Sequence, residues 1–271
     1  MSGIWAGPAA DPVFGPDAFA GRRVIVTGGA SGIGAALCEI LVSCGASVAL
    51  LDLNEHLAAD VAVRLGDAVR AFSVDVGDER AATAAIVSAA KWLGGIDGLA
   101  NVAGTVRPSM ICDGEVAPML VAVAVNLYGP LYTCRAAVPF LRQATNPSIV
   151  NVASQAASQA YPGGGLYGPS KAGLVALTKQ FALELAREGI RANVVSPGSI
   201  DTPMAQPVDD AGRRRQELRD SRLPLGRRGH PREVAATIAF LLSTAASYIT
   251  AQQINVGGGL DQTVLPGPFS A

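Results

Sequence analysis

The chain has 271 residues, a length that is common for a single α/β domain. Hydrophobic residues make up 49% of it and charged residues 16%, a balance that excludes an intrinsically disordered protein. The formal net charge of -1 provides no basic surface of the kind that binds nucleic acid. The four cysteines form no C-x-x-C pair and no histidine has metal-ligand spacing, so we expect reduced thiols in a cytoplasmic protein without a metal site.

The first twenty residues contain Gly and Pro but no basic region followed by an apolar core, so they do not predict a secretory signal. We expect residues 1–20 to form a loose extension before one domain that covers residues 21–271. No uninterrupted apolar run reaches the 18 residues of a membrane span, so the sequence predicts no transmembrane segment.

Apolar runs rich in β-branched residues alternate with helical patterns along the chain. Strands are predicted over residues 22–27, 47–52, 69–75, 98–101, 148–152, 191–196 and 252–256. Helices are predicted over residues 32–44, 55–65, 79–93, 118–142, 166–187 and 231–242. The strands are continuously apolar, which indicates burial on both faces. We therefore predict an α/β fold with a doubly wound (Rossmann), mostly parallel seven-stranded sheet and helices on both faces.

Residues 197–229 form the least regular stretch, with clustered Pro and Arg. They follow a strand end, where open α/β sheets bind ligands, so we expect them to cover the substrate as a lid. The alternative is an ordinary solvated loop and helix. The run Arg213–Arg215 could bind an acidic substrate, but the acidic residues around it favour a solvated helix of mixed charge.

A glycine-rich segment joins the first predicted strand to the first predicted helix. Gly28 permits a tight turn, Gly32 lets the backbone approach a pyrophosphate, and Gly34 lets the helix pack closely on the strand. The helix N-terminus then presents free N–H groups to the phosphates. The spacing is G-x-x-x-G-x-G rather than G-x-G-x-x-G, so its position between a strand and a helix is what favours a dinucleotide site.

Asp52 ends the second predicted strand, 18 residues after Gly34. A carboxylate at this place accepts hydrogen bonds from the adenosine ribose and repels a 2′-phosphate, which favours NAD over NADP. The alternative is that Asp52 is only a turn residue. Asp75 ends the third predicted strand, from which it could bind the adenine.

Tyr167 and Lys171 lie four residues apart at the start of an apolar-periodic helix, so their side chains share a face. Pro169 between them is tolerated only in a first helical turn. A free phenol is a poor base at neutral pH, and we expect the ammonium and the helix dipole to lower its pKa. Ser154 follows the fifth predicted strand, where its hydroxyl could hold a substrate oxygen. The order of these groups along the chain is more specific than the Tyr-x-x-x-Lys spacing alone.

Together these motifs resemble those of the short-chain dehydrogenase/reductase family, over about residues 22–259. The resemblance implies that Tyr167 is the proton donor or acceptor and that Lys171 binds the nicotinamide ribose. It also implies that Ser154 polarises the carbonyl and that Asn126 holds a water in a proton relay. The departures are small: Val102 stands where the family has a second Asn, and Ala251 and Gly257 stand where Gly and Asp are frequent.

The resemblance also implies binding residues. The expected cofactor residues are Gly28, Ser31, Gly32, Ile33, Gly34, Asp52, Leu53, Asp75, Val76, Asn101, Ala103, Gly104, Tyr167, Lys171, Pro197, Gly198, Ile200 and Thr202. The expected substrate residues are Ser154, Gln155, Tyr161, Tyr167 and Met204. The segment that begins at Pro197 would contact the nicotinamide carboxamide. The apolar residues Tyr161, Leu166 and Met204 favour an uncharged substrate.

The function predicted from the sequence is the reversible oxidation of a secondary alcohol to a ketone, with NAD as cofactor. One alternative is an NADPH-dependent 3-oxoacyl reductase of the same family, and another is a catalytically idle NAD-binding scaffold. The resemblance implies a homotetramer. We expect the partners to be a small alcohol or ketone, with no nucleic acid and no membrane.

Overall fold

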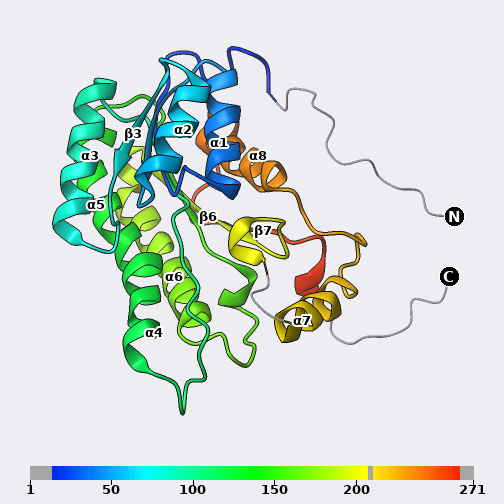
Figure 1. Cartoon of the computed structure of the whole chain (residues 1–271). Coiled ribbons are helices and arrows are strands. Elements are labelled where there is room, and N and C mark those ends of the chain that lie inside the picture. The colour runs from blue at the N-terminus through cyan, green and yellow to red at the C-terminus, as the bar shows by residue number, and fades with distance from the viewer. Residues whose placement is uncertain (1–13, 207–209, 263–271) are drawn as a thin grey trace, which may run out of the picture.

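The computed structural model describes residues 14–206 and 210–262, and a single parallel sheet of seven strands lies at its centre (Figure 1). The strands are β1 Arg23–Thr27, β2 Ser47–Asp52, β3 Val69–Ser73, β4 Gly98–Asn101, β5 Ser148–Val152, β6 Arg191–Pro197 and β7 Gln253–Val256. Their order across the sheet is β3-β2-β1-β4-β5-β6-β7. The predicted fold class, a doubly wound α/β fold, is therefore confirmed.

Helices cover both faces of the sheet (Figure 1). They are α1 Gly32–Ser43, α2 Glu55–Leu65, α3 Glu79–Leu93, α4 Val116–Val123, α5 Gly129–Leu141, α6 Tyr167–Leu185, α7 Asp210–Asp220 and α8 Pro231–Leu242. One hydrophobic cluster packs α1, α2 and α8 against the sheet, and a second packs α3, α5 and α6 against its other face. Alternate residues of β1, β2, β4 and β5 enter the two clusters, as Val24 and Ile25 of β1 do, which explains why these strands are continuously apolar.

The long helix predicted over residues 118–142 is interrupted. The π-helical segment Ala124–Tyr128 separates α4 from α5 and brings an extra residue into one turn. The third strand also ends two residues before the predicted limit at Asp75. The carboxylate of Asp75 accepts a hydrogen bond from the Gly77 N–H at 2.8 Å, which turns the chain out of the sheet.

The helical stretch Val116–Leu141 is long and apolar enough, by length and composition, to cross a membrane. Core helices of globular proteins meet the same criterion. Here α5 packs against α3 on the sheet, and α4 packs against α6. Within the described residues this stretch is therefore a helix of the α/β layers, and it supports no membrane assignment.

The last residues of the expected N-terminal extension pack against the domain. Residues 1–13 lie outside the described residues, but Phe19 is only 1% exposed and belongs to the first hydrophobic cluster. Its ring packs edge-on against Phe14, and its N–H donates to the carbonyl of Cys44. The packed domain therefore begins before the predicted boundary at residue 21.

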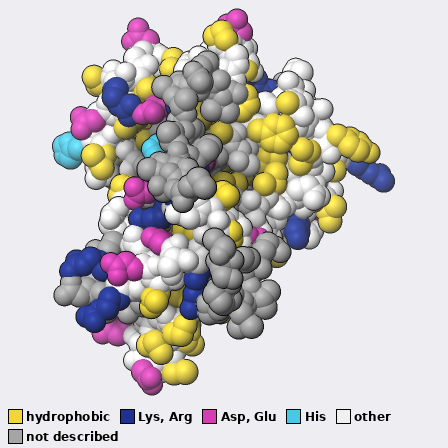
Figure 2. Space-filling view, turned by 90° about the vertical axis from the view of Figure 1, so that its right-hand side faces the viewer, with side chains coloured by type: hydrophobic (Ala, Val, Ile, Leu, Met, Phe, Trp, Pro, Cys, Tyr) yellow, Lys and Arg dark blue, Asp and Glu magenta, His cyan; other side chains and the backbone are white. Residues whose placement is uncertain are grey.

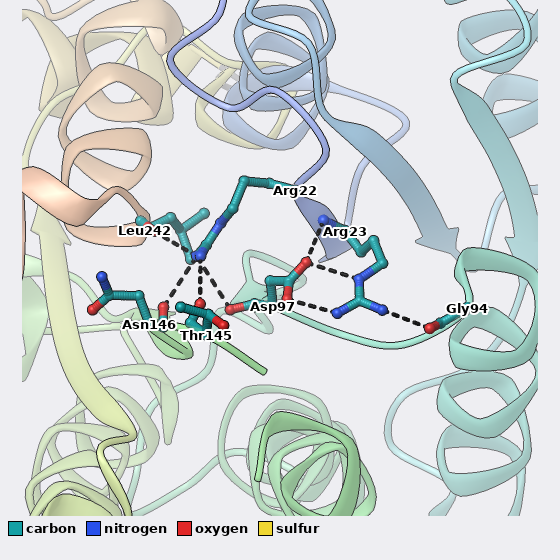
Figure 3. Close-up of polar contacts among 7 residues, drawn as sticks. All are labelled: Arg22, Arg23, Gly94, Asp97, Thr145, Asn146 and Leu242. Atoms are coloured by element: carbon teal, nitrogen blue, oxygen red, sulfur yellow. Dashed lines mark hydrogen bonds and ion pairs between the residues drawn. The ribbon is translucent and has the colours of Figure 1, made fainter. Parts of the chain in front are cut away.

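Two arginines hold the amino edge of the sheet (Figure 3). Arg22 donates to the carbonyls of Thr145, Asn146 and Leu242 at 2.9–3.2 Å, and so joins the residue before β1 to the end of α8. Arg23 donates through its backbone N–H and its guanidinium to the carboxylate of Asp97. Burial raises the pKa of Asp97, but the hydrogen bonds from Arg23 outweigh it and leave that pKa below its ordinary value.

The face of the molecule in Figure 2 carries Lys and Arg side chains interspersed with Asp and Glu. Neither sign gathers into a patch on this face. Arg213 and Arg214 lie within helix α7, and their side chains are exposed. This arrangement agrees with a solvated helix of mixed charge.

Candidate active site

The candidate site lies at the carboxyl edge of the sheet, at the point where the strand order reverses. Strands β1 and β4 are neighbours there, with Thr27 paired to Asn101, and the chain leaves them in opposite directions. The hydroxyl oxygen of Thr27 accepts hydrogen bonds from the N–H groups of Val102 and Ala103, both at 3.2 Å. The loops that follow β1 and β4 thereby form one wall of a cavity of about 800 Å³.

Nearly all of the residues predicted from the sequence line this one cavity. Asp52 is the last residue of β2 and Ser154 lies two residues after β5, so β1 and β4 lie between them. At the usual spacing of neighbouring strands, three intervals correspond to about 14 Å. The cavity is therefore long enough to hold an extended dinucleotide, with Asp52 at one end and Ser154 at the other.

The glycine segment adopts a conformation that only glycine tolerates without strain. Gly28 has φ 67°, and a Cβ there would come within 2.6 Å of the Ala103 backbone. At Gly34 a Cβ would overlap the carbonyl oxygen of Gly28, which shows how closely α1 approaches the end of β1. The N-terminus of α1 therefore opens directly into the cavity, where its free N–H groups suit a pyrophosphate.

Asp52 is held in place by the backbone. One carboxylate oxygen accepts from the Ala30 N–H at 3.0 Å and the other from the Asn54 N–H at 2.9 Å. Both donors are backbone N–H groups rather than cationic side chains, so the two bonds hold a negative charge beside the glycine segment. Such a charge disfavours a phosphate on the adenosine ribose.

Helix α6 begins at Tyr167, with Pro169 in its first turn and Lys171 one turn further on. The Lys171 side chain is 3% exposed, and its Nζ donates to the carbonyl of Val152 at 2.8 Å. Burial lowers the pKa of Lys171 from 10.5 to about 8. The ammonium is therefore fixed at the end of β5, two residues before Ser154 in the chain.

The pKa of the Tyr167 phenol is not lowered, contrary to the expectation that Lys171 would lower it. Burial raises the pKa of Tyr167 above its ordinary value, and a hydrogen bond from Ser154 opposes this only in part. The reason is that the Lys171 ammonium is directed to the Val152 carbonyl rather than to the phenol. The protein alone thus holds Tyr167 in its protonated form, paired with Ser154.

Two of the predicted residues do not line the cavity, Asn101 and Asn126. The Asn101 side chain lies beneath the sheet and bonds Asn151 and Thr133, both at 2.8 Å, so it ties β4 to β5 and α5. The Asn126 amide bonds the N–H and carbonyl of Thr105, both at 2.9 Å. Asn126 lies in the π-helical segment and thereby fixes the loop that follows β4.

At the Ser154 end the cavity is lined by Gln155, Tyr161 and Met204, the predicted substrate residues. Gln155 is buried, whereas Tyr161 and Met204 are about half exposed. Sequence reasoning missed Arg107 and Arg219, which line the same cavity. Arg107 stands just after the Asn-Val-Ala-Gly segment and could have been found from that proximity; Arg219 is distant in sequence from every motif.

A family model described as enoyl-(acyl carrier protein) reductase matches residues 28–261, from the glycine segment to the last described turn. The chain belongs to the short-chain dehydrogenase/reductase family. It is therefore an oxidoreductase of that family, which acts on CH–OH groups. The resemblance that the sequence motifs indicated is confirmed.

Curated relatives of this short-chain dehydrogenase/reductase differ in substrate. The chain is 37% identical over 243 residues to the 3-oxoacyl-(acyl-carrier-protein) reductase of Thermotoga maritima, covering 89% of this chain and 98% of that protein. It is 34% identical to the NAD(+)-linked 2-dehydro-3-deoxy-L-rhamnonate dehydrogenase of a Sphingomonas species, covering 89% and 96%. The crystal structure of levodione reductase superposes with a TM-score of 0.85 at 29% identity, covering 90% of this chain and 99% of that one.

The buried Lys171 predicts a pH-dependent stability of this dehydrogenase/reductase. Below pH 8 the ammonium is charged in both states, and the folded protein bears the full cost of burying it. Between pH 8 and 10.5 the unfolded chain binds more protons, so this contribution to stability rises with pH. Relative to Lys171→Met, we expect the wild-type free energy of unfolding to rise by about 3 kcal/mol over that interval.

Urea unfolding of the wild-type protein and of Lys171→Met at several pH values measures this difference. Other titrating groups are shared by the two proteins and largely cancel in the comparison. Parallel stability profiles from pH 7 to pH 10.5 would show that Lys171 has an ordinary pKa in the folded protein.

Proposed function

We propose that this protein reversibly oxidises a secondary alcohol to a ketone with NAD as cofactor. The observation that supports this most directly is that Ser154, Tyr167 and Lys171 meet at one end of a cavity whose other end presents Asp52. The first three supply a hydrogen-bond donor, a proton donor or acceptor and a fixed cation. Asp52 supplies the group that distinguishes the two nicotinamide dinucleotides.

The residues fit a nicotinamide dinucleotide. Gly28 and Gly34 let the end of β1, the start of α1 and the loop after β4 approach one another closely, and the α1 N-terminus faces the cavity. Pro197, Gly198 and Thr202, from the end of β6 and the loop after it, also line the cavity and would bind the nicotinamide half. When bound, NAD supplies the hydride acceptor for alcohol oxidation and, as NADH, the donor for the reverse reaction.

Side chains of the protein would carry out the proton transfer. In oxidation, Tyr167 accepts the proton of the substrate hydroxyl while Ser154 orients the same oxygen by a hydrogen bond. Because burial raises the pKa of Tyr167, the phenol needs a nearby positive charge to act as a base. Lys171, whose Nζ lies at the end of β5, would provide that charge and would bind the ribose of the cofactor. Asn126, from the π-helical segment, would hold the water through which the proton leaves.

Two alternatives remain open to test. An NADPH-dependent 3-oxoacyl reductase is suggested by the Thermotoga maritima relative, but Asp52 opposes a 2′-phosphate. A catalytically idle NAD-binding scaffold is opposed by the presence of Ser154, Tyr167 and Lys171 around one cavity.

A screen of secondary alcohols with NAD and with NADP tests the proposed function. We expect absorbance of the reduced cofactor with NAD and at least one alcohol, and a lower kcat/KM with NADP. Higher kcat/KM with NADP would favour the 3-oxoacyl reductase. Tight NADH binding without turnover of any alcohol or ketone would favour the scaffold.

Replacing Asp52 with Asn is expected to reduce the preference for NAD over NADP by about tenfold to a hundredfold, since it removes a charge that repels the 2′-phosphate. Adding Leu53→Arg, at an exposed position beside it, would reduce the preference further. The measurement is kcat/KM with each cofactor on one alcohol.

Asp75→Asn provides the matched control for Asp52→Asn. Asp75 also lines the cavity and also bonds a backbone N–H, but we assign it to the adenine rather than to the ribose. We expect its replacement to leave the NAD to NADP ratio unchanged. An unchanged ratio in Asp52→Asn as well would remove Asp52 from cofactor selection.

The assembly that we propose is a homotetramer in the cytoplasm, as the family resemblance implies. Exposed apolar side chains on the α4–α6 part of the chain, such as Leu120, Tyr128 and Leu183, would suit such contacts. We also propose that residues 197–229 act as a lid, because Met204 and Arg219 from this segment line the cavity. Light scattering tests the assembly.

A further inference from the structure

The substrate end of the cavity contains two arginines that the chemistry above does not use. Arg107 lies in the loop after β4, and Arg219 lies on α7, which follows β6 in the chain. Ser154 follows β5, the strand between β4 and β6. The two cations therefore enter the cavity from segments on either side of the serine.

Arg107 is held in position by its own loop. Its Nη1 donates to the Thr105 hydroxyl oxygen at 2.8 Å and to the carbonyl of Val106 at 3.2 Å. Within the described part of the chain, its Nε and Nη2 have no hydrogen-bond acceptor. A guanidinium fixed through one nitrogen presents its remaining N–H donors in a planar fork that matches a carboxylate.

Arg219 is only loosely paired. Its Nε lies 4.0 Å from a carboxylate oxygen of Asp220, at the limit of an ion pair. Asp220 also accepts from the Ser199 hydroxyl at 3.0 Å and faces Arg228 at 3.7 Å. The positive charge of Arg219 lowers the pKa of the Tyr161 phenol, against a larger opposite effect of burial. Arg219 thus acts on the same part of the cavity that Tyr161 lines.

Carboxylates do not offset these two cations inside the cavity. Among its described lining residues the only acidic ones are Asp52, which ends β2, and Asp75, which follows β3, both at the far end. Nearby, Asp201 pairs with Arg228, and the Asp261 carboxylate accepts from Gln155 and Asn255. The lining of the substrate end therefore has three cationic side chains, Arg107, Arg219 and Lys171, and no acidic one.

We propose that the substrate has an anionic group, which Arg107 and Arg219 bind while its carbinol or carbonyl lies at Ser154 and Tyr167. The group is an oxyanion such as a carboxylate, phosphate or sulfonate, attached through a short spacer to the reacting carbon. This inference rests on the proposed function for the reacting end of the substrate. It replaces the expectation of an uncharged substrate, which rested on the apolar residues alone.

Calorimetric titration with matched ligands tests the proposal without turnover. The ligands are 4-acetylbenzoate and levulinate, each compared with its neutral amide, in the presence of NAD, with which a ketone cannot react, and without it. We expect at least one acid to bind about tenfold or more tightly than its amide. Arg107→Gln and Arg219→Gln should each remove most of that preference, whereas Arg222→Gln, outside the cavity lining, should retain it.

The preference for the acid should also weaken as the salt concentration rises, because exposed arginines are screened. Equal binding of acid and amide in the wild-type protein overturns the proposal, as does a preference that survives both Arg107→Gln and Arg219→Gln. Binding of neither pair overturns it as well. Failure of the proposed function has a different signature, since the acids would then bind selectively while no alcohol or ketone reacts with NAD or NADH.

Discussion

Replacing Tyr167 with Phe is expected to lower kcat for alcohol oxidation by about three orders of magnitude, in the range typical of a lost general acid–base group. The substitution removes one oxygen and leaves the ring at the start of α6, so the fold should not change. Ser154 would still orient the substrate oxygen, but no group would accept its proton.

Tyr167→Phe should affect the rate of turnover but not the binding of NADH. We expect NADH affinity, measured by fluorescence, to change little while turnover is lost. Tyr128→Phe is a matched control, because Tyr128 is an exposed tyrosine outside the cavity lining. Turnover of Tyr167→Phe within a few fold of wild type would refute the assignment of the acid–base role.

Replacing Gly34 with Ala is expected to remove dinucleotide binding and to destabilise the fold. The new Cβ would overlap the Gly28 carbonyl oxygen, which is backbone and cannot rotate away. Helix α1 would have to withdraw from β1, which costs about 3 kcal/mol or more and moves its N-terminus away from the phosphates. We expect NADH affinity to fall by at least about a hundredfold, since about 2.7 kcal/mol of lost binding energy has that effect.

Thermal unfolding and NADH titration measure these two effects of Gly34→Ala. Gly15→Ala is the control, because no atom lies within 4 Å of a Cβ at Gly15 and its φ is not positive. The control should behave as wild type in both measurements. Wild-type NADH affinity in Gly34→Ala would contradict the close approach of helix and strand that the structure shows.

The sheet and its helices could be predicted because their determinants are local. Continuous apolar runs mark strands that are covered on both faces, and most observed strand limits agree with the predicted ones to within one or two residues. The largest difference, two residues, is at Asp75, whose carboxylate forms a turn that apolar periodicity does not register. The π-helical segment around Asn126 was missed for a related reason, because a single extra residue in a turn leaves the apolar pattern almost unchanged.

The candidate site was predicted where a motif fixes both the residue and its place on the sheet edge. Gly28, Asp52 and Ser154 are of this kind, since each lies at the carboxyl end of a strand or within two residues of it. Asn101 also ends a strand, but its side chain points into the core network, and strand position alone does not give the direction of a side chain. Arg219 reaches the cavity only through the path of α7, which no spacing in the sequence reveals.

The contact of Arg22 with Leu242 has a consequence for folding kinetics. It joins residues separated by 220 positions, the residue just before β1 and the last residue of α8. A contact of such sequence separation closes a very large loop, so the amino edge of the sheet forms late, after most of the chain has condensed. During synthesis, Arg22 has all of its hydrogen-bond acceptors only after α8 has been made. Truncation before α8 would therefore yield an aggregation-prone fragment rather than a smaller independent unit.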